Sequence, residues 1–158
     1  IAMELCRLHN PVVTMCCGTV NRKNLAVSGQ NTLEMLENIN IDMAFIGVSG
    51  CSVEAGFTCG TEADMLVKRM VIRKARTSVA MCSHEKFSSL MPYTFATLPD
   101  VDYLITDSPL PEGFALQVVG GITLSACAAA AACSSWGKNR VPFSYRSPTR
   151  SSAGISRF

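Results

Sequence analysis

The chain has 158 residues, of which 48% are hydrophobic and 16% are charged, with a formal net charge of +2 at pH 7. This length allows one domain with a moderate core, and the net charge is too small to imply a nucleic-acid partner by itself. The apolar runs are too short to span a bilayer, and the first residues lack the charged-then-apolar layout of a secretion signal. We therefore expect a soluble, cytoplasmic protein that has no membrane partner.

Eight cysteines raise the question of a metal site or of disulfides. No two are spaced as C-x-x-C, and His9 and His84 stand far from any paired thiols in the sequence. We therefore expect reduced thiols, without a metal or a cofactor, as suits the cytoplasm. Cys16, Cys17 and Cys82 fall in stretches that predict strands, where cysteine behaves as a small buried hydrophobe.

The first part of the chain predicts two helices separated by a strand. Residues 1–8 have the pattern of the end of an amphipathic helix, which Pro11 terminates. Residues 12–17 (VVTMCC) are rich in β-forming residues and predict a strand. Residues 31–38 predict a second helix, with leucines on one side and glutamates on the other.

The middle of the chain has the clearest pattern. Residues 43–48 (MAFIGV) are almost wholly apolar, as in a strand that is buried on both faces of a parallel sheet. Gly47, Gly50 and Gly56 then predict a glycine-rich loop whose backbone can approach a ligand closely. After Thr61, apolar residues recur at spacings of three and four, which predicts a helix.

Two more strands follow, at residues 78–82 (SVAMC) and 101–106 (VDYLIT), with a short turn of helix between them at 95–98. Strands that alternate with a helix indicate an α/β fold with a mostly parallel sheet and flanking helices. Residues 114–119 predict another helix, and residues 122–125 predict a last strand.

Residues 126–158 have a different composition, rich in Ser, Arg and Pro and without any acidic residue. This tail could be a basic arm for nucleic acid. We favour a disordered terminus, or a sequence foreign to the domain, because such a composition cannot offset the entropy of ordering. The predicted domain therefore covers residues 1–125.

Four separated pieces occur in a characteristic order: IDMAFIGVSG, EAGFTCGTEADMLVKRMVIRKA, SHEKF and LPDVDYLITD. With them the chain resembles the effector-sensing domain of the DeoR family of bacterial transcriptional regulators, over roughly residues 18–124. The resemblance implies a three-layer fold shared with ribose-5-phosphate isomerase and CoA-transferase-like proteins. It also implies a homo-oligomer that binds a phosphorylated sugar or a related metabolite, and so tunes the DNA affinity of a winged helix-turn-helix domain.

The sequence departs from the family pattern in several ways, of which three bear on function. The winged helix is absent, so we expect DNA contact only through a domain outside this sequence. The family's first sheet strand, with its Asp-x-Gly-Ser/Thr-Thr phosphate loop, is also missing. Ser83 stands where many members carry Asp three residues before the lysine. We therefore expect a truncated sensor.

Ten residues are candidate ligand-binding groups: Gly47, Gly50, Gly56, Thr58, Thr61, Glu62, Lys68, Lys86, Thr106 and Asp107. Lys86 is the strongest, because a lysine just past a strand end sits where open α/β sheets place ligands, and an ammonium suits a phosphate. An ordinary surface lysine is the alternative. The glycines could expose N–H groups to an anion, or could simply make turns.

Thr58, Thr61 and Glu62 stand at a loop-to-helix junction that favours anions, although the simplest role for Thr61 is the helix N-cap. Lys68 on the same helix could contact a ligand or an interface, or lie on a solvated face. Thr106 and Asp107 end a strand, where Asp107 could bind sugar hydroxyls or only form a turn.

A binding module without catalysis is the leading prediction, and two alternatives stay open. The first is a sugar-phosphate isomerase, for which Glu62, Asp64 and Asp107 are the plausible bases. The second is a remnant whose only role is oligomerisation. A nucleophile pair of Cys82 and His84 is disfavoured, because no third group is evident to orient it.

Overall fold

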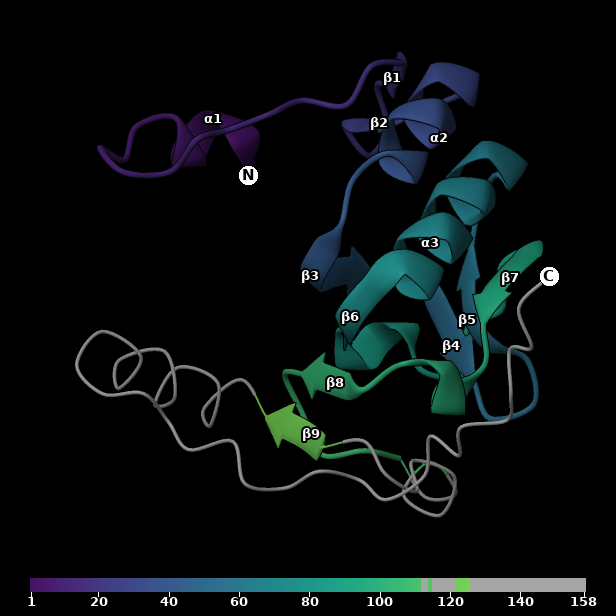
Figure 1. The fold of residues 1–158 in the computed structure, drawn as a ribbon. Helices are drawn as coiled ribbons and strands as arrows, with labels where there is room; N and C mark the ends of the chain where they lie inside the picture. The colour runs from purple at the N-terminus through teal and green to yellow at the C-terminus, as the bar shows by residue number, and fades with distance from the viewer. Residues whose placement is uncertain (112–113, 115–121, 126–158) are drawn as a thin grey trace, which may run out of the picture.

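The computed structural model describes residues 1–111, 114 and 122–125, which Figure 1 shows as a ribbon. The helix predicted at 114–119 and the tail at 126–158 lie outside the described residues, except for the single position 114. The first elements are α1 (Ala2–Leu5), β1 (Thr19–Asn21), β2 (Ala26–Ser28) and α2 (Gln30–Glu37). The α1 segment stands apart from the two larger sheets, and none of its residues is buried.

A parallel sheet forms the centre of the molecule, with the strand order β3-β6-β8-β9. Its strands are β3 (Ile41–Gly47), β6 (Ala75–Met81), β8 (Tyr103–Thr106) and β9 (Ile122–Ser125). Ile46 pairs with Ala80, and Ala80 pairs with Leu104, so buried apolar residues form a row across three strands. The predicted α/β class, with a parallel sheet and flanking helices, is confirmed.

Helix α3 (Glu62–Lys74) lies in the crossover between β3 and the parallel β6, after two short strands, and packs against the sheet (Figure 1). Thr61 is its N-cap, as predicted, and its side chain accepts a 3.3 Å hydrogen bond from the backbone N–H of Asp64. Acidic residues occupy its first turn, and Arg73 and Lys74 occupy its last turn. Both placements complement the helix dipole.

The predicted glycine-rich loop is a β-hairpin instead. Strands β4 (Gly50–Ser52) and β5 (Gly56–Cys59) pair antiparallel, and β7 (Tyr93–Ala96) adds to β5. The helical turn predicted at 95–98 is therefore wrong, because the first part of it belongs to β7. Phe57 and Phe95 stack at a centroid distance of 6.2 Å, and this aromatic packing on paired strands favours the sheet. A 3-10 turn, η2 (Leu98–Asp100), follows.

The strand predicted at 12–17 is also wrong. That run is irregular, and Val12 is 94% exposed, because no strand pairs with it among the described residues. A strand without a partner leaves its backbone groups unsatisfied and has no face to bury. Cys17 is consequently exposed and Cys16 half-buried, whereas the expectation of a buried thiol is confirmed for Cys82, which is 2% exposed.

The core lies between α3 and the two larger sheets. Its most buried side chains are Cys51, Phe57, Cys59, Ala80 and Leu104. At the start of β8, Asp102 accepts hydrogen bonds from the backbone N–H and the hydroxyl of Ser78, at 2.8 and 2.9 Å, which fixes the register of β8 against β6. Within the described residues, no helix is long and apolar enough to cross a membrane.

Candidate functional site at the strand ends

Three parallel strands end side by side at one edge of the central sheet. Gly47 ends β3 and pairs with Met81, which ends β6 and pairs with Ile105 of β8. The backbone continues this contact past the strand ends, since Val48 donates to Met81 and Cys82 donates to Ile105, both at 3.0 Å. Ligands of open α/β sheets bind outside such carboxyl ends, so this edge is the candidate site.

A 3-10 turn, η1 (His84–Lys86), crosses this edge just after β6. The backbone N–H of His84 donates to Oδ1 of Asp107 at 2.7 Å, and Nδ1 of His84 lies 3.4 Å from Oδ2. The backbone hydrogen bond from His84 is the largest cause that lowers the pKa of Asp107 below its ordinary value of 3.8. Asp107, at the end of β8, therefore holds η1 in place and stays ionised.

Lys86 is the cation of this edge. Its side chain is half-buried and makes no ion pair with any residue that the structure describes. Lys86 and Asp107 both act electrostatically on the thiol of Cys82, at the end of β6, so the two charges share one neighbourhood. A partly desolvated ammonium without a carboxylate partner suits an anionic ligand.

The three candidate glycines differ in what surrounds them. A Cβ at Gly47 would meet nothing within 4 Å, so this strand end is open. A Cβ at Gly50 would come within 2.7 Å of the backbone oxygen of Ser89. Gly56 has a φ of +72°, and a Cβ there would collide with the backbone oxygen of Ala96. Gly50 and Gly56 thus permit close packing of the hairpin.

Two other candidates contact residues of the three-stranded sheet β4-β5-β7. Thr58 is completely buried, and its hydroxyl donates to the backbone oxygen of Gly50 at 2.9 Å and accepts from the N–H of Met91 at 3.1 Å. Lys68 is only 15% exposed, so it does not lie on a solvated face. Its Nζ lies 2.9 Å from Asp64 and 5.0 Å from the ring centroid of Phe95.

The remaining candidates frame the edge. Thr106 is buried at the end of β8, and its hydroxyl lies 3.5 Å from the carboxylate of Asp107. Thr61 and Glu62 are exposed at the start of α3. Because α3 returns the chain from the end of β3 to the start of β6, its N-terminus is on the side where the strands end. The structure thus gathers Gly47, Lys86, Thr106 and Asp107 near the strand ends. It commits Gly50, Gly56 and Thr58 to the packing of the hairpin, and Lys68 to Asp64 and to Phe95 of β7.

Two residues near the edge have contacts that sequence reasoning missed. His84 contacts Asp107, and Cys51 forms a backbone bridge with Phe87. Their spacing carries no signal, because each pair joins different strands or loops. The thiol of Cys82 makes a local contact, with its Sγ 3.7 Å from the backbone oxygen of Ser83. Among residues 1–111, no three His, Cys, Asp or Glu side chains gather in a way that could hold a metal ion.

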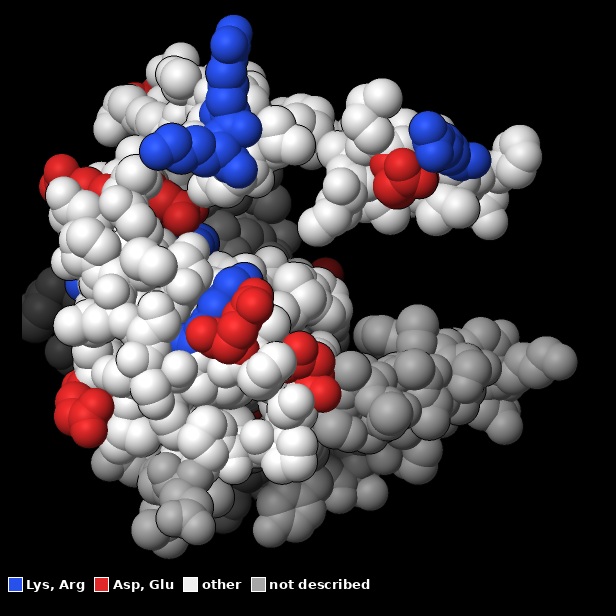
Figure 2. All heavy atoms as spheres, turned by 180° about the vertical axis from the view of Figure 1, so that it is seen from behind, with Lys and Arg blue, Asp and Glu red and all other residues white. Residues whose placement is uncertain are grey.

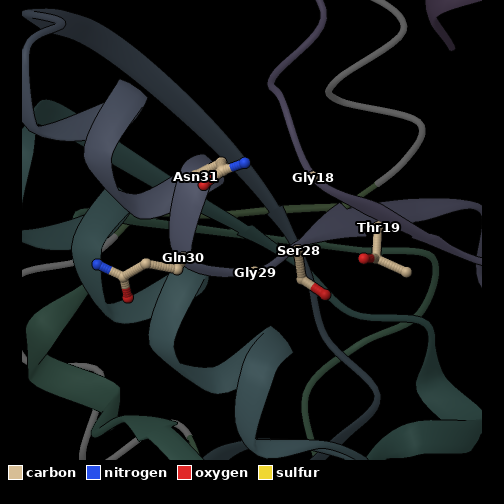
Figure 3. Close-up of a pocket in the computed structure, with 6 residues that line it drawn as sticks. All are labelled: Gly18, Thr19, Ser28, Gly29, Gln30 and Asn31. Atoms are coloured by element: carbon tan, nitrogen blue, oxygen red, sulfur yellow. The ribbon is translucent and has the colours of Figure 1, made fainter.

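A separate polar hollow of about 330 Å³ lies between the β1–β2 hairpin and the start of α2. Figure 3 shows the residues that line it, namely Gly18, Thr19, Ser28, Gly29, Gln30 and Asn31. Gly29 is the N-cap of α2 and has no side chain to cap the helix. The sequence predicted the helix that begins here, but not the β1–β2 hairpin or the hollow before it.

Charges of both signs are scattered over the face shown in Figure 2, and the described part of that face carries no continuous basic surface. This distribution agrees with the small net charge of +2. It does not resemble the clustered Lys and Arg side chains of a nucleic-acid-binding face.

The sequence matches the DeoR C terminal sensor domain over residues 1–108. The chain belongs to the DeoR sensor family. This assignment agrees with the parallel sheet and with the order of its elements. The match ends just after β8 and so includes all the residues of the candidate site.

Individual relatives are regulators. The chain is 37% identical over 90 residues to the HTH-type transcriptional repressor GlcR of Bacillus subtilis, a match that covers 57% of the chain and 34% of GlcR. It is 33% identical over 98 residues to a putative sgc region transcriptional regulator of Escherichia coli, covering 62% of the chain and 38% of that protein. It is 30% identical over 129 residues to the HTH-type transcriptional regulator GlpR of Haloferax volcanii, covering 77% and 50%. The chain thus spans a third to a half of the length of these relatives.

Proposed function

We propose that this DeoR sensor domain binds a phosphorylated sugar, or a related anionic metabolite, at the strand-end edge and does not transform it. The observation that carries the proposal is the placement of Lys86. It is half-buried in the turn that Asp107 holds through His84, and it makes no ion pair with a described residue. An ammonium in that setting gains most from a phosphate that completes its charge pairing.

The proposed ligand site divides into two parts. Lys86 binds the phosphate, and the open backbone at Gly47 leaves room for the group to approach the end of β3. Asp107 lies half-exposed and can accept hydrogen bonds from sugar hydroxyls, with Thr106 beside it. Thr61 and Glu62 border the site from the start of α3.

Gly50, Gly56, Thr58 and Lys68 have a supporting role in this proposal. Their atoms are already in contact with the hairpin or with β7. They therefore hold the hairpin in its position beside the strand ends, and act on the ligand through that position.

An isomerase is less well supported, because each plausible base is poorly placed for proton abstraction. The pKa of Asp107 is lowered by its hydrogen bonds to His84, which makes its carboxylate a weaker base. Asp64 is paired with Lys68 at 2.9 Å, and Glu62 is exposed to solvent. A catalytic base needs a pKa raised toward neutrality, whereas that of Asp107 is shifted the other way.

In the whole regulator, we propose that ligand binding to this domain alters the DNA affinity of a separate helix-turn-helix part, in the cytoplasm. The names of the relatives support this, since GlcR is a repressor and GlpR a regulator of the HTH type. We also propose self-association along β3, the outermost strand of the central sheet on one side. Met43 and Phe45 of the edge strand β3 are 39% and 53% exposed, and they offer an apolar surface.

The test is a thermal-shift screen of the purified chain against a panel of phosphorylated sugars, with the unphosphorylated sugars alongside. A ligand that binds only the native state stabilises that state by mass action and so raises the melting temperature. At a ligand concentration of 100 times Kd, the gain in the free energy of unfolding is about 2.7 kcal/mol. Lys86→Ala is expected to lose this shift. Lys23→Ala, at an exposed lysine of the β1–β2 turn, is the matched control and is expected to keep it.

Two results would contradict the proposal. A shift that is equal in Lys86→Ala would place the phosphate elsewhere, and the hollow at Gly18 and Gly29 would be the next candidate. Conversion of a phosphosugar by the purified chain would support the isomerase. Light scattering across the same samples separates ligand binding from association alone.

A further inference from the structure

His84 is held at the strand-end edge by two contacts with one carboxylate. Its backbone N–H donates to Oδ1 of Asp107 at 2.7 Å, and its Nδ1 lies 3.4 Å from Oδ2 of the same side chain. The first contact fixes the backbone of η1, and the second fixes the direction of the imidazole ring. The ring is therefore oriented at the edge without being buried in it, since 65% of the side chain is exposed.

The second nitrogen of this ring has no partner in the described part of the chain. Nε2 of His84 makes no hydrogen bond or ion pair there. The two nitrogens of an imidazole point in different directions, so a ring that directs Nδ1 to Asp107 directs Nε2 away from it. The side of the ring that remains for a ligand is the one that carries Nε2.

Lys86 stands two residues further along the same 3-10 turn, η1. Such a turn advances by about 2 Å per residue, so the backbones of the two residues are close together. The stem of a lysine is long and flexible, and Lys86 makes no ion pair with a residue that the structure describes. Its ammonium can therefore reach an anionic group that is bound at Nε2 of His84.

The surroundings of the imidazole favour its protonated form once such an anion binds. The titratable groups nearest to it in the fold are Asp107 after β8, Glu85 and Lys86 in η1, and Cys82 after β6. Asp107 is ionised, because the backbone hydrogen bond from His84 is the largest cause that lowers its pKa below 3.8. Glu85 accepts a 3.3 Å hydrogen bond from the hydroxyl of Ser83. A phosphate at Nε2 adds a second negative charge beside the ring, and only an imidazolium donates from both nitrogens.

We propose that His84 is a second phosphate-binding group of the candidate site, and that its imidazole takes up a proton when the phosphate binds. The inference rests on the proposed function for the place of the ligand. It adds that the bound group is a phosphate monoester, and that its affinity falls as the pH rises. The proton comes from the solvent, and no bond of the ligand is broken.

The direction of the pH dependence follows from the two charge states. Imidazole side chains generally lose their proton between pH 5 and pH 8, whereas a phosphate monoester is mainly a dianion above about pH 6. Above neutral pH the charge of the ligand is therefore nearly constant, while an imidazole is mostly neutral before binding. Binding to the imidazolium then takes up one proton, which weakens the affinity by at most about tenfold per pH unit.

Methyl phosphate is the probe for the first experiment, because it is a phosphate monoester without any sugar. The chain has two histidines, His9 and His84, so a long-range proton–nitrogen spectrum shows two imidazole rings, which His9→Gln assigns. We expect methyl phosphate to shift the His84 signals toward those of a protonated ring, and to move the midpoint of their pH titration upward. The His9 signals are expected to stay in place. Unchanged His84 signals at the highest probe concentration would overturn the proposal.

Affinity measurements separate a ligand contact from a structural role. The wild type is expected to bind methyl phosphate several times more weakly at about pH 8 than at about pH 7. His84→Gln cannot take up a proton and is expected to bind the probe weakly and equally at both values. His9→Gln is the matched control and is expected to keep the wild-type pH dependence. A wild-type pH dependence in His84→Gln would assign the proton to another group and overturn the proposal. If His84→Gln fails to fold, the titration of the wild-type ring still decides the question.

This proposal and the proposed function fail in different ways. If phosphorylated sugars raise the melting temperature through Lys86 but the His84 ring does not respond to methyl phosphate, the proposed function stands and the role of His84 falls. If the ring responds with the expected pH dependence but no phosphorylated sugar raises the melting temperature, His84 binds phosphate and the sugar ligand falls. If neither occurs, both proposals are overturned.

Discussion

The backbone N–H of His84 and the carboxylate of Asp107 are joined by a hydrogen bond of 2.7 Å. This bond connects the turn that carries Lys86 to the end of β8. The segments that carry the two charges of the candidate site are therefore fixed to each other.

The first prediction concerns the acid stability that Asp107 contributes. Its pKa is lower in the folded chain than its ordinary value of 3.8, so the contribution is present above that value and is lost as the pH falls through the folded pKa. We expect the melting temperature of the wild type to fall more steeply below pH 3.8 than that of Asp107→Asn, which has no carboxylate to titrate there. Melting curves across the acid range measure this. Asp42→Asn, at an exposed position of β3, is expected to follow the wild type.

The second prediction concerns the buried hydroxyl of Thr58. Thr58→Val keeps the shape of the side chain but removes both hydrogen bonds of the hydroxyl. The backbone oxygen of Gly50 and the backbone N–H of Met91 then lose this hydrogen-bond partner. We expect a loss of about 1–3 kcal/mol in the free energy of unfolding, measured with a chemical denaturant. Thr94 pairs with Thr58 on the neighbouring strand and is only half-buried. Thr94→Val is expected to cost much less, and equal losses would argue against a special role for the Thr58 hydroxyl.

The third prediction compares two glycines. Gly56→Ala forces a side chain into a φ of +72° and against the backbone of Ala96, so we expect a loss of more than about 2 kcal/mol. Gly47→Ala adds a methyl group to open space and is expected to leave the melting temperature nearly unchanged. If the ligand approaches the end of β3, Gly47→Ala lowers its affinity all the same. Unchanged affinity in a stable Gly47→Ala variant would remove this residue from the site.

The fourth prediction concerns the ion pair between Lys68 and Asp64. Both side chains are mostly buried, at 15% and 16% exposed, and Lys68 also lies over the ring of Phe95. A double-mutant cycle of Lys68→Met and Asp64→Asn is expected to give a coupling energy of about 1 kcal/mol, at the upper end for exposed pairs, because water screens this pair less. Ligand-induced shifts in melting temperature are expected to persist in Lys68→Met. Their loss would return Lys68 to the binding site.

Local patterns were enough to predict the positions of the parallel strands, but not the burial of β3. This strand was predicted to be buried on both faces, and that is wrong: β3 lies at the edge of the sheet, with Met43 and Phe45 39% and 53% exposed. Each of the patterns that predicted this part of the fold is complete within a short stretch of sequence. They are the apolar run before Gly47, the three-and-four spacing after Thr61 and the run that ends at Thr106. For the same reason the N-cap role of Thr61 was predictable, since its partner Asp64 lies within one helical turn. Prediction failed where the structure of a segment depends on a strand that pairs with it from far along the chain. Residues 12–17 have the composition of a strand without a partner to pair with, and residues 50–59 became a hairpin because β7 pairs with it.

The sequence by itself determined the α/β class, the family and the position of Lys86 after a strand, because these depend on local periodicity and on short motifs. Only the tertiary structure decided which candidate residues share a site. It set the Thr58 hydroxyl against Met91, Lys68 against Phe95 of β7, and Asp107 against His84. Each of these contacts joins segments that are distant in the chain. The packing of two sheets against one helix selects such contacts, and no spacing in the sequence encodes them.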